Sequence, residues 1–143
     1  MEQPEDKAQP AALPIDTDWF LQSVVDLVNN TGMGLPITLQ VSGMLVSGQV
    51  VTGEEFFEQM AIAVSSAVEN EEIASDLKTF LETFRDVYRQ NNESDKKSRP
   101  HFIHLKNARF FTSNSKPIPN NPTWWRGRLS EVAGFIFGTL AVS

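Results

Sequence analysis

A stripe of apolar residues at helical spacing runs from residue 53 to residue 91 and restricts the folds open to this chain. Its members are Phe57, Met60, Ala61, Val64 and Val68, followed by Ile73, Leu77, Phe80, Leu81, Phe84 and Val87. One straight helix of this length would measure about 58 Å, whereas a compact domain of this size is roughly 37 Å across. We therefore expect a helical hairpin broken at the polar cluster 69–72, in preference to one long helix.

The first 30 residues divide into a tail and a helix. Residues 1–15 carry three prolines and almost no bulky apolar side chains, so burial cannot offset the entropy lost on ordering, and we expect a disordered tail. Beyond them the apolar residues recur at helical spacing, and Asp16 or Asp18 can cap a helix over residues 17–30. The sequence thus predicts one folded domain over residues 16–143.

Two alternating segments between this helix and the stripe predict a bent β-hairpin. Residues 35–41 place apolar side chains at every second position, and residues 44–51 do so except at Gly48, which is the period of a strand with one buried face. Ser42 and Gly43 form the expected turn. Gly48 indicates a bulge or a close approach of another backbone.

Strand-forming residues rich in aromatics and glycine follow a polar linker at 91–100. They predict strands near 102–112, 124–130 and 132–141. Residues 112–123 contain three prolines and three asparagines, so we expect a mobile loop or a contact surface there. The predicted fold class is α+β: a curved antiparallel sheet with an amino-terminal helix and an inserted helical segment.

Charge is divided unevenly along the chain. Residues 1–92 hold four basic and fifteen acidic residues, a net charge of −11, whereas residues 93–143 hold eight basic and three acidic residues, a net charge of +5. Segments of opposite sign can attract partners of either sign, or another copy of the chain. The alternative is that the two parts neutralise each other within one fold.

The composition excludes several classes of protein. The chain has no cysteine, which rules out disulfide scaffolds, thiolate catalysis and cysteine-ligated metal sites. No apolar run approaches the roughly 18 residues of a membrane-spanning helix. The first ten residues lack the basic and apolar regions of a secretory signal, so we expect a cytoplasmic protein without membrane contact.

Motifs for catalysis or cofactor binding are missing from the sequence. His101 and His104 would lie on opposite faces of the predicted strand, so we do not expect them to share a metal ion. Nucleophile elbows, phosphate-binding glycine loops and dinucleotide fingerprints are absent. We therefore expect no enzymatic activity, no catalytic residue, no metal and no cofactor. A hydrolase built on the histidines would require a carboxylate close to one of the imidazoles.

The segment WWRGRL carries the strongest indication of a binding surface. Because neighbouring strand residues face opposite ways, we expect Trp125 to point into the core and Trp124, Arg126 and Arg128 to lie on the outer face. Such aromatic and cationic side chains suit a protein contact. We therefore predict a protein-binding surface, which also includes two basic residues of the strand near 102–112, Lys106 and Arg109.

The alternative to a protein contact is a nucleic-acid-binding module. In it, Trp124, Arg126, Arg128 and Lys106 would stack on bases and contact phosphates. Nucleic-acid binding normally requires a larger basic excess than this chain provides, so we do not expect nucleic acid to be the partner.

Three sequence strings resemble a known family. They are LPITLQVSGMLVSGQVVTGEEFF, HFIHLKNARFF and WWRGRLSEVAGFIFGTL, and in this order they are similar to gas vesicle protein U, a minor accessory protein of gas vesicle gene clusters. The similarity runs from about residue 17 to 140. The order of helix, bent hairpin and late strands also resembles Sm-like and SH3-like small barrels with a helical insert, which is an analogy of fold alone.

The resemblance implies a cytoplasmic, non-enzymatic protein that is associated with gas vesicles, the hollow protein-shelled flotation bodies. It implies shell proteins or other accessory proteins as partners, an influence on vesicle assembly or clustering, and no catalytic residues. Self-association through the oppositely charged segments is a further expectation.

Overall fold

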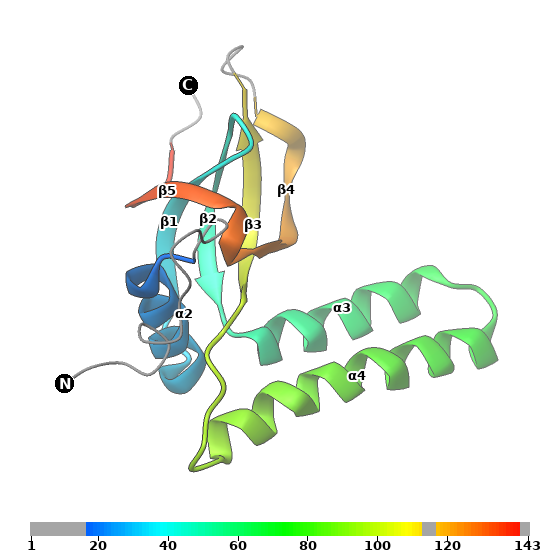
Figure 1. Cartoon of the computed structure of the whole chain (residues 1–143). Helices are drawn as coiled ribbons and strands as arrows, with labels where there is room; N and C mark the ends of the chain where they lie inside the picture. Colours follow the sequence, from blue (N-terminus) through cyan, green and yellow to red (C-terminus); the bar gives the residue numbers. More distant parts are fainter. Residues whose placement is uncertain (1–16, 113–116, 141–143) are drawn as a thin grey trace.

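A curved antiparallel sheet of five strands forms the centre of the computed structural model, which describes residues 17–112 and 117–140 (Figure 1). The strands are β1 (Leu35–Val41), β2 (Met44–Val51), β3 (Phe102–Phe111), β4 (Pro117–Arg128) and β5 (Val132–Phe137). Their order across the sheet is β4-β3-β2-β1-β5, and every neighbouring pair is antiparallel. The sheet stays open, with β4 and β5 at its edges, and does not close into a barrel within these residues.

Helix α2 (Trp19–Thr31) covers one face of the sheet, which we call the inner face. It begins after Asp18, whose carboxylate accepts a hydrogen bond from the backbone N–H of Phe20 at 2.9 Å, and it ends at Gly32 with φ of 73°. The buried core joins this helix to the strands through Leu21, Val25, Val28, Ile37, Leu39, Val46, Val50, Ile103, Leu105, Ala108 and Leu129. The predicted amino-terminal helix and its aspartate cap are confirmed.

The long apolar stripe forms two antiparallel helices, α3 (Gly53–Ala67) and α4 (Glu71–Glu93), which we call the hairpin. Thr52 caps α3 by accepting a hydrogen bond from the N–H of Glu55 at 2.9 Å, and Asn70 caps α4 in the same way from Ile73 at 3.0 Å. The predicted break is therefore confirmed. Figure 1 shows the hairpin extending away from the sheet, with only its base close to the strands.

The loop predicted over residues 112–123 is wrong for its second half, because β4 already begins at Pro117. Phe111 pairs with Pro117, and Phe110 pairs with Ile118. Prolines lack the N–H donor that a central strand needs, but β4 lies at an edge, where one side of the strand needs no donor. This position explains how a proline-rich segment can belong to the sheet.

The carboxyl-terminal strand is shorter than predicted. Residues 129–131 form a single turn of 3₁₀ helix, so the strand expected over 124–130 ends at Arg128. Strand β5 ends at Phe137 and does not continue to residue 141, because Gly138 adopts φ of 109° and turns the chain. The expected disordered tail, residues 1–15, lies outside the described residues.

Bulges distort the middle of β2 and β3. The pairing register shifts between Ser47 and Gln49, which confirms the irregularity predicted at Gly48. Across the sheet, Asn107 has φ of 54°, in the left-handed region, and the β3–β4 register shifts between Leu105 and Ala108. Bulges change the direction of side chains, and these two lie beneath the pocket described below.

Candidate functional site

The outer face of β3 and β4, opposite α2, carries all five residues predicted to bind a partner. We call Lys106, Arg109, Trp124, Arg126 and Arg128 the basic face. The pairing of β3 with β4 places Arg126 beside His104 and Arg128 beside Phe102. As predicted, Trp125 packs against the buried core on the inner face. The structure brings the five residues onto one face, but three of them also make contacts within the molecule.

Arg126 connects the sheet to the hairpin. Its Nη1 lies 3.2 Å from His104 Nε2, and its guanidinium carbon lies 3.7 Å from the ring centroid of Phe102 and 5.3 Å from that of Phe57. Because arginine can only donate hydrogen bonds, Nε2 accepts, and the ring proton of a neutral His104 lies on Nδ1. Arg126 is therefore a structural residue as well as part of the basic face.

His104 is buried, with 1% of its surface exposed, beneath the base of the hairpin. The rings of Phe56, Phe57 and Tyr88 lie with centroids 4.7, 5.8 and 5.5 Å from the imidazole. Burial, assisted by the positive charge of Arg126, lowers the pKa of His104 to about 3. The imidazole is therefore neutral at physiological pH, and its neighbours are an arginine and aromatic rings, which do not form the histidine–carboxylate arrangement that a hydrolase would need.

The base of the hairpin is fixed by further contacts. The ring of Tyr88 packs directly over Gly53 at the start of α3, where a larger residue would collide with it. Burial raises the pKa of the Tyr88 phenol, against the opposing effect of nearby Arg126. Arg89 donates two hydrogen bonds to the Glu54 carboxylate, at 2.8 and 3.0 Å. These contacts fix the two helices to each other next to the sheet.

Three other members of the basic face differ in their contacts within the molecule and in their exposure. The Nζ atom of Lys106 lies 3.8 Å from a carboxylate oxygen of Glu55, and the half-buried ring of Trp124 lies 6.4 Å from that of Phe56. Arg128 is exposed. It is therefore the member of the basic face best placed to meet a partner without disturbing the fold.

The hairpin presents a surface of the opposite sign. Residues 53–93 include ten acidic and three basic residues, a net charge of −7. Helix α4 has no buried residue, and the hairpin leaves apolar side chains exposed at Ile62, Ile73, Phe80, Phe84 and Val87. Two helices alone cannot bury both sides of such a stripe, so an apolar strip remains at the surface.

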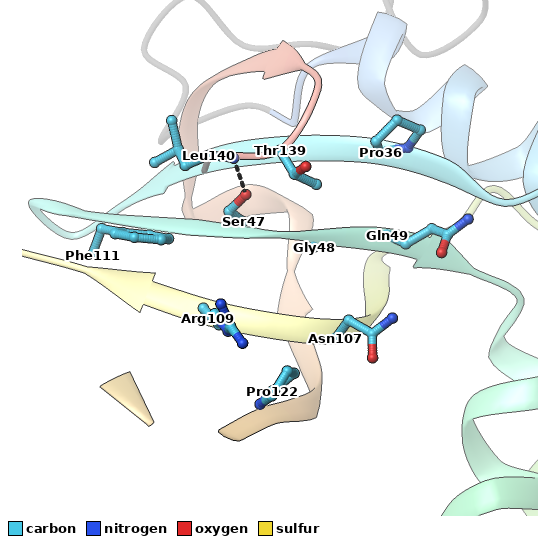
Figure 2. Close-up of a pocket in the computed structure, with 10 residues that line it drawn as sticks. All are labelled: Pro36, Ser47, Gly48, Gln49, Asn107, Arg109, Phe111, Pro122, Thr139 and Leu140. Atoms are coloured by element: carbon cyan, nitrogen blue, oxygen red, sulfur yellow. Dashed lines mark hydrogen bonds between the residues drawn. The ribbon is translucent and has the colours of Figure 1, made fainter. Parts of the chain in front are cut away.

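A pocket of about 440 Å³ opens beside the basic face (Figure 2). Its floor consists of strands β2 and β3, with Pro122 of β4 on one side and the segment after β5 on the other. That segment is fixed by three hydrogen bonds: the Thr38 hydroxyl donates to the Gly138 carbonyl at 2.8 Å, the N–H of Gly138 donates to the Pro36 carbonyl at 2.9 Å, and the N–H of Leu140 donates to the Ser47 hydroxyl at 2.8 Å. Sequence reasoning missed this pocket, although Gly48 in its floor was recognised as irregular.

The described residues do not form a paired-histidine site, a metal site or a membrane-spanning helix. His101 precedes β3 and is exposed, so it does not share surroundings with His104. Within residues 17–112 and 117–140, no three histidine or acidic side chains are grouped so that they could hold a metal ion. No helix in the same part of the chain is both long and apolar enough to cross a membrane.

One of three comparisons with known proteins agrees with the resemblance seen in the sequence. Searches of curated proteins and of solved structures give no match. A family model described as gas vesicle protein GvpU-like matches residues 18–140, from the cap of α2 to the segment after β5. Since this match covers most of the chain, the protein belongs to the GvpU-like family of gas vesicle proteins.

Proposed function

We propose that this chain is a non-enzymatic accessory protein that binds the gas vesicle shell or other accessory proteins and thereby influences vesicle assembly or clustering. Membership of the GvpU-like family supports the link to gas vesicles. The separation of charge between the hairpin and the sheet supports binding, and it is the observation on which the proposal depends. As part of this proposal, the protein is cytoplasmic and associated with gas vesicles.

The charge of the hairpin is largely left without compensation inside the fold. Among the residues that the structure describes, one ion pair joins the hairpin to the sheet, between Lys106 and Glu55. The hairpin points away from the sheet (Figure 1), so the turn between α3 and α4, with Glu69 and the adjacent Glu71 and Glu72, lies at the end remote from the strands. This arrangement argues against the alternative in which the two halves neutralise each other.

Two surfaces of opposite sign allow one molecule to take part in two contacts. The basic face attracts an acidic surface, and the acidic hairpin attracts a basic one. A partner that offers both signs, including a second copy of this chain, could therefore be linked into larger assemblies. The exposed apolar strip of the hairpin would add to the binding free energy, since apolar patches commonly mark interaction surfaces.

Reversing the charge of Arg128 tests the basic face without disturbing the fold. Both arginines are exposed, but Arg126 is unsuitable because its guanidinium contacts His104 and Phe102, contacts that the Arg128 side chain does not make. Arg128→Glu is expected to weaken binding to purified gas vesicles about fivefold, because an attractive exposed contact becomes repulsive. Binding is measured by co-flotation of the protein with the vesicles, which rise during slow centrifugation.

Lys96→Glu is the matched control, because it makes the same change of charge at an exposed position in the loop between α4 and β3, outside both the hairpin and the basic face. It should leave co-flotation unchanged. Equal co-flotation of the wild type and Arg128→Glu would contradict the assignment of the basic face.

Fluorescence titration with a single-stranded oligonucleotide tests the nucleic-acid alternative. That alternative predicts saturable binding of the oligonucleotide, which Arg128→Glu weakens.

A further inference from the structure

The pocket on the outer face is lined by one cationic side chain among uncharged residues. Its lining residues are Pro36, Ser47, Gly48, Gln49, Asn107, Arg109, Phe111, Pro122, Thr139 and Leu140. Arg109 is the charged residue of this set, and no acidic side chain belongs to it. The volume of about 440 Å³ lies within the usual range of ligand pockets.

The guanidinium of Arg109 has no polar partner among the described residues. The structure gives its guanidinium neither a hydrogen bond nor an ion pair within residues 17–112 and 117–140, although the side chain is half-buried. Arg126 differs, because it bonds to His104 and stacks on Phe102. A half-buried arginine with unused donors, in a pocket without acidic groups, is suited to an anionic ligand.

Local backbone geometry places two amides in the same pocket. Asn107, at the bulge with φ of 54°, and Arg109, two residues later on β3, both line the pocket (Figure 2). Gln49 lies on the neighbouring strand β2 and also lines it. An amide side chain both donates and accepts hydrogen bonds, which matches the N–H and C=O groups of a peptide backbone.

The remaining walls are largely apolar, although Ser47 and Thr139 also belong to them, and they restrict the class of ligand further. Pro36, Phe111, Pro122 and Leu140 provide the apolar part of these walls. A single guanidinium can hold one carboxylate through two parallel hydrogen bonds. A nucleic acid would need several cations along its backbone, and the other lining residues of the pocket are uncharged.

We propose that this pocket binds an acidic peptide segment of a protein partner. The carboxylate lies on Arg109, the peptide backbone is bonded by Gln49 and Asn107, and a neighbouring apolar side chain lies against the prolines. The inference rests on the proposed protein-binding function and specifies the ligand of one member of the basic face.

A pair of blocked peptides tests this assignment. The first, acetyl-Gly-Leu-Glu-Leu-Gly-amide, has a carboxylate between two apolar residues, and the second replaces the glutamate by glutamine. Titration of the ¹⁵N-labelled protein is expected to shift the side-chain amide signals of Gln49 and Asn107 and the Nε–H signal of Arg109 with the first peptide. The glutamine peptide should bind about tenfold more weakly, because it cannot form the charged pair.

Variants separate the arginine from general charge effects. Arg109→Gln should lower affinity for the glutamate peptide about tenfold, and Arg109→Lys should fall in between because lysine lacks the planar fork. Lys78→Gln, the same loss of charge at an exposed site on α4, should have no effect. The amide spectrum of each variant also reports whether it is folded.

Equal binding of the two peptides would overturn the proposal, as would shifts confined to residues outside the pocket or stronger shifts at the same residues from a single-stranded oligonucleotide. Hexanoate, added alone, distinguishes a site for free acids from one for peptides, and binding as tight as that of the peptide would also overturn it. If the peptides fail but vesicle co-flotation still depends on Arg128, the pocket assignment is wrong and the proposed function stands. If the peptides bind but vesicles do not, the proposed function fails instead.

Discussion

Between pH 7 and pH 4 the free energy of unfolding is expected to fall by about 3 kcal/mol through His104 alone. Burial lowers the pKa of this imidazole to about 3 in the folded chain, against 6.5 when it is unfolded. The unfolded state therefore binds the proton first as the pH drops. The stabilising effect is complete above pH 6.5 and is lost progressively below it, by about 1.4 kcal/mol for each pH unit until pH 3.

Urea unfolding at a series of pH values measures this effect. Acidic side chains also titrate in the same range, so the wild type must be compared with His104→Gln, which cannot be protonated but can still accept a hydrogen bond from Arg126. His101→Gln is the matched control, because His101 is exposed and lies three residues away. His104→Gln should flatten the pH dependence, whereas a slope unchanged from that of the wild type would show that His104 is not buried as described.

Gly48→Val is expected to destabilise the protein by about 3 kcal/mol, at the upper end of the usual cost of overpacking. A side chain at this position would meet backbone atoms of β3: the carbonyl oxygen of Lys106 at 2.9 Å and the Cα atom of Ala108 at 3.1 Å. Backbone atoms in the middle of a sheet cannot move aside as a flexible side chain can. Thermal and urea unfolding of the variant measure the loss.

Gly134→Val provides the control for this substitution. Gly134 lies in β5, and a Cβ atom there meets only the side-chain oxygen of Gln40, at 3.8 Å, which is an ordinary contact. Its stability should remain within about 0.5 kcal/mol of the wild type. A similar loss for both variants would mean that glycine is needed for the strands in general and not for the close approach at the bulge.

Much of the fold follows from local patterns in the sequence. The helical period between residues 53 and 91, together with Thr52 and Asn70 as caps, predicts the hairpin that the structure contains. Alternation along WWRGRL correctly places Trp125 against the core on the inner face and Arg128 at the surface. Both predictions depend only on residues close together in the chain.

The features of the fold and of the candidate site that the sequence did not predict depend on contacts between residues far apart in the chain. The proline-rich start of β4 is compatible with a strand only because it lies at a sheet edge, and edge position is a property of topology. His104 becomes buried because Phe56 and Tyr88 of the hairpin cover it. The pocket likewise requires Leu140 to lie beside Ser47, 93 residues earlier. Patterns of neighbouring residues in the sequence do not predict such long-range contacts.

Co-flotation of the wild-type protein with purified gas vesicles at increasing salt tests the central claim, that charged surfaces attach this chain to vesicles. Salt screens exposed charges over about 8 Å at physiological ionic strength and over about 3 Å at 1 M. The bound fraction should therefore be large at low salt and fall steadily as sodium chloride is raised. A protein that fails to rise with the vesicles at low salt, or one whose bound fraction is the same at every salt concentration, would contradict the account.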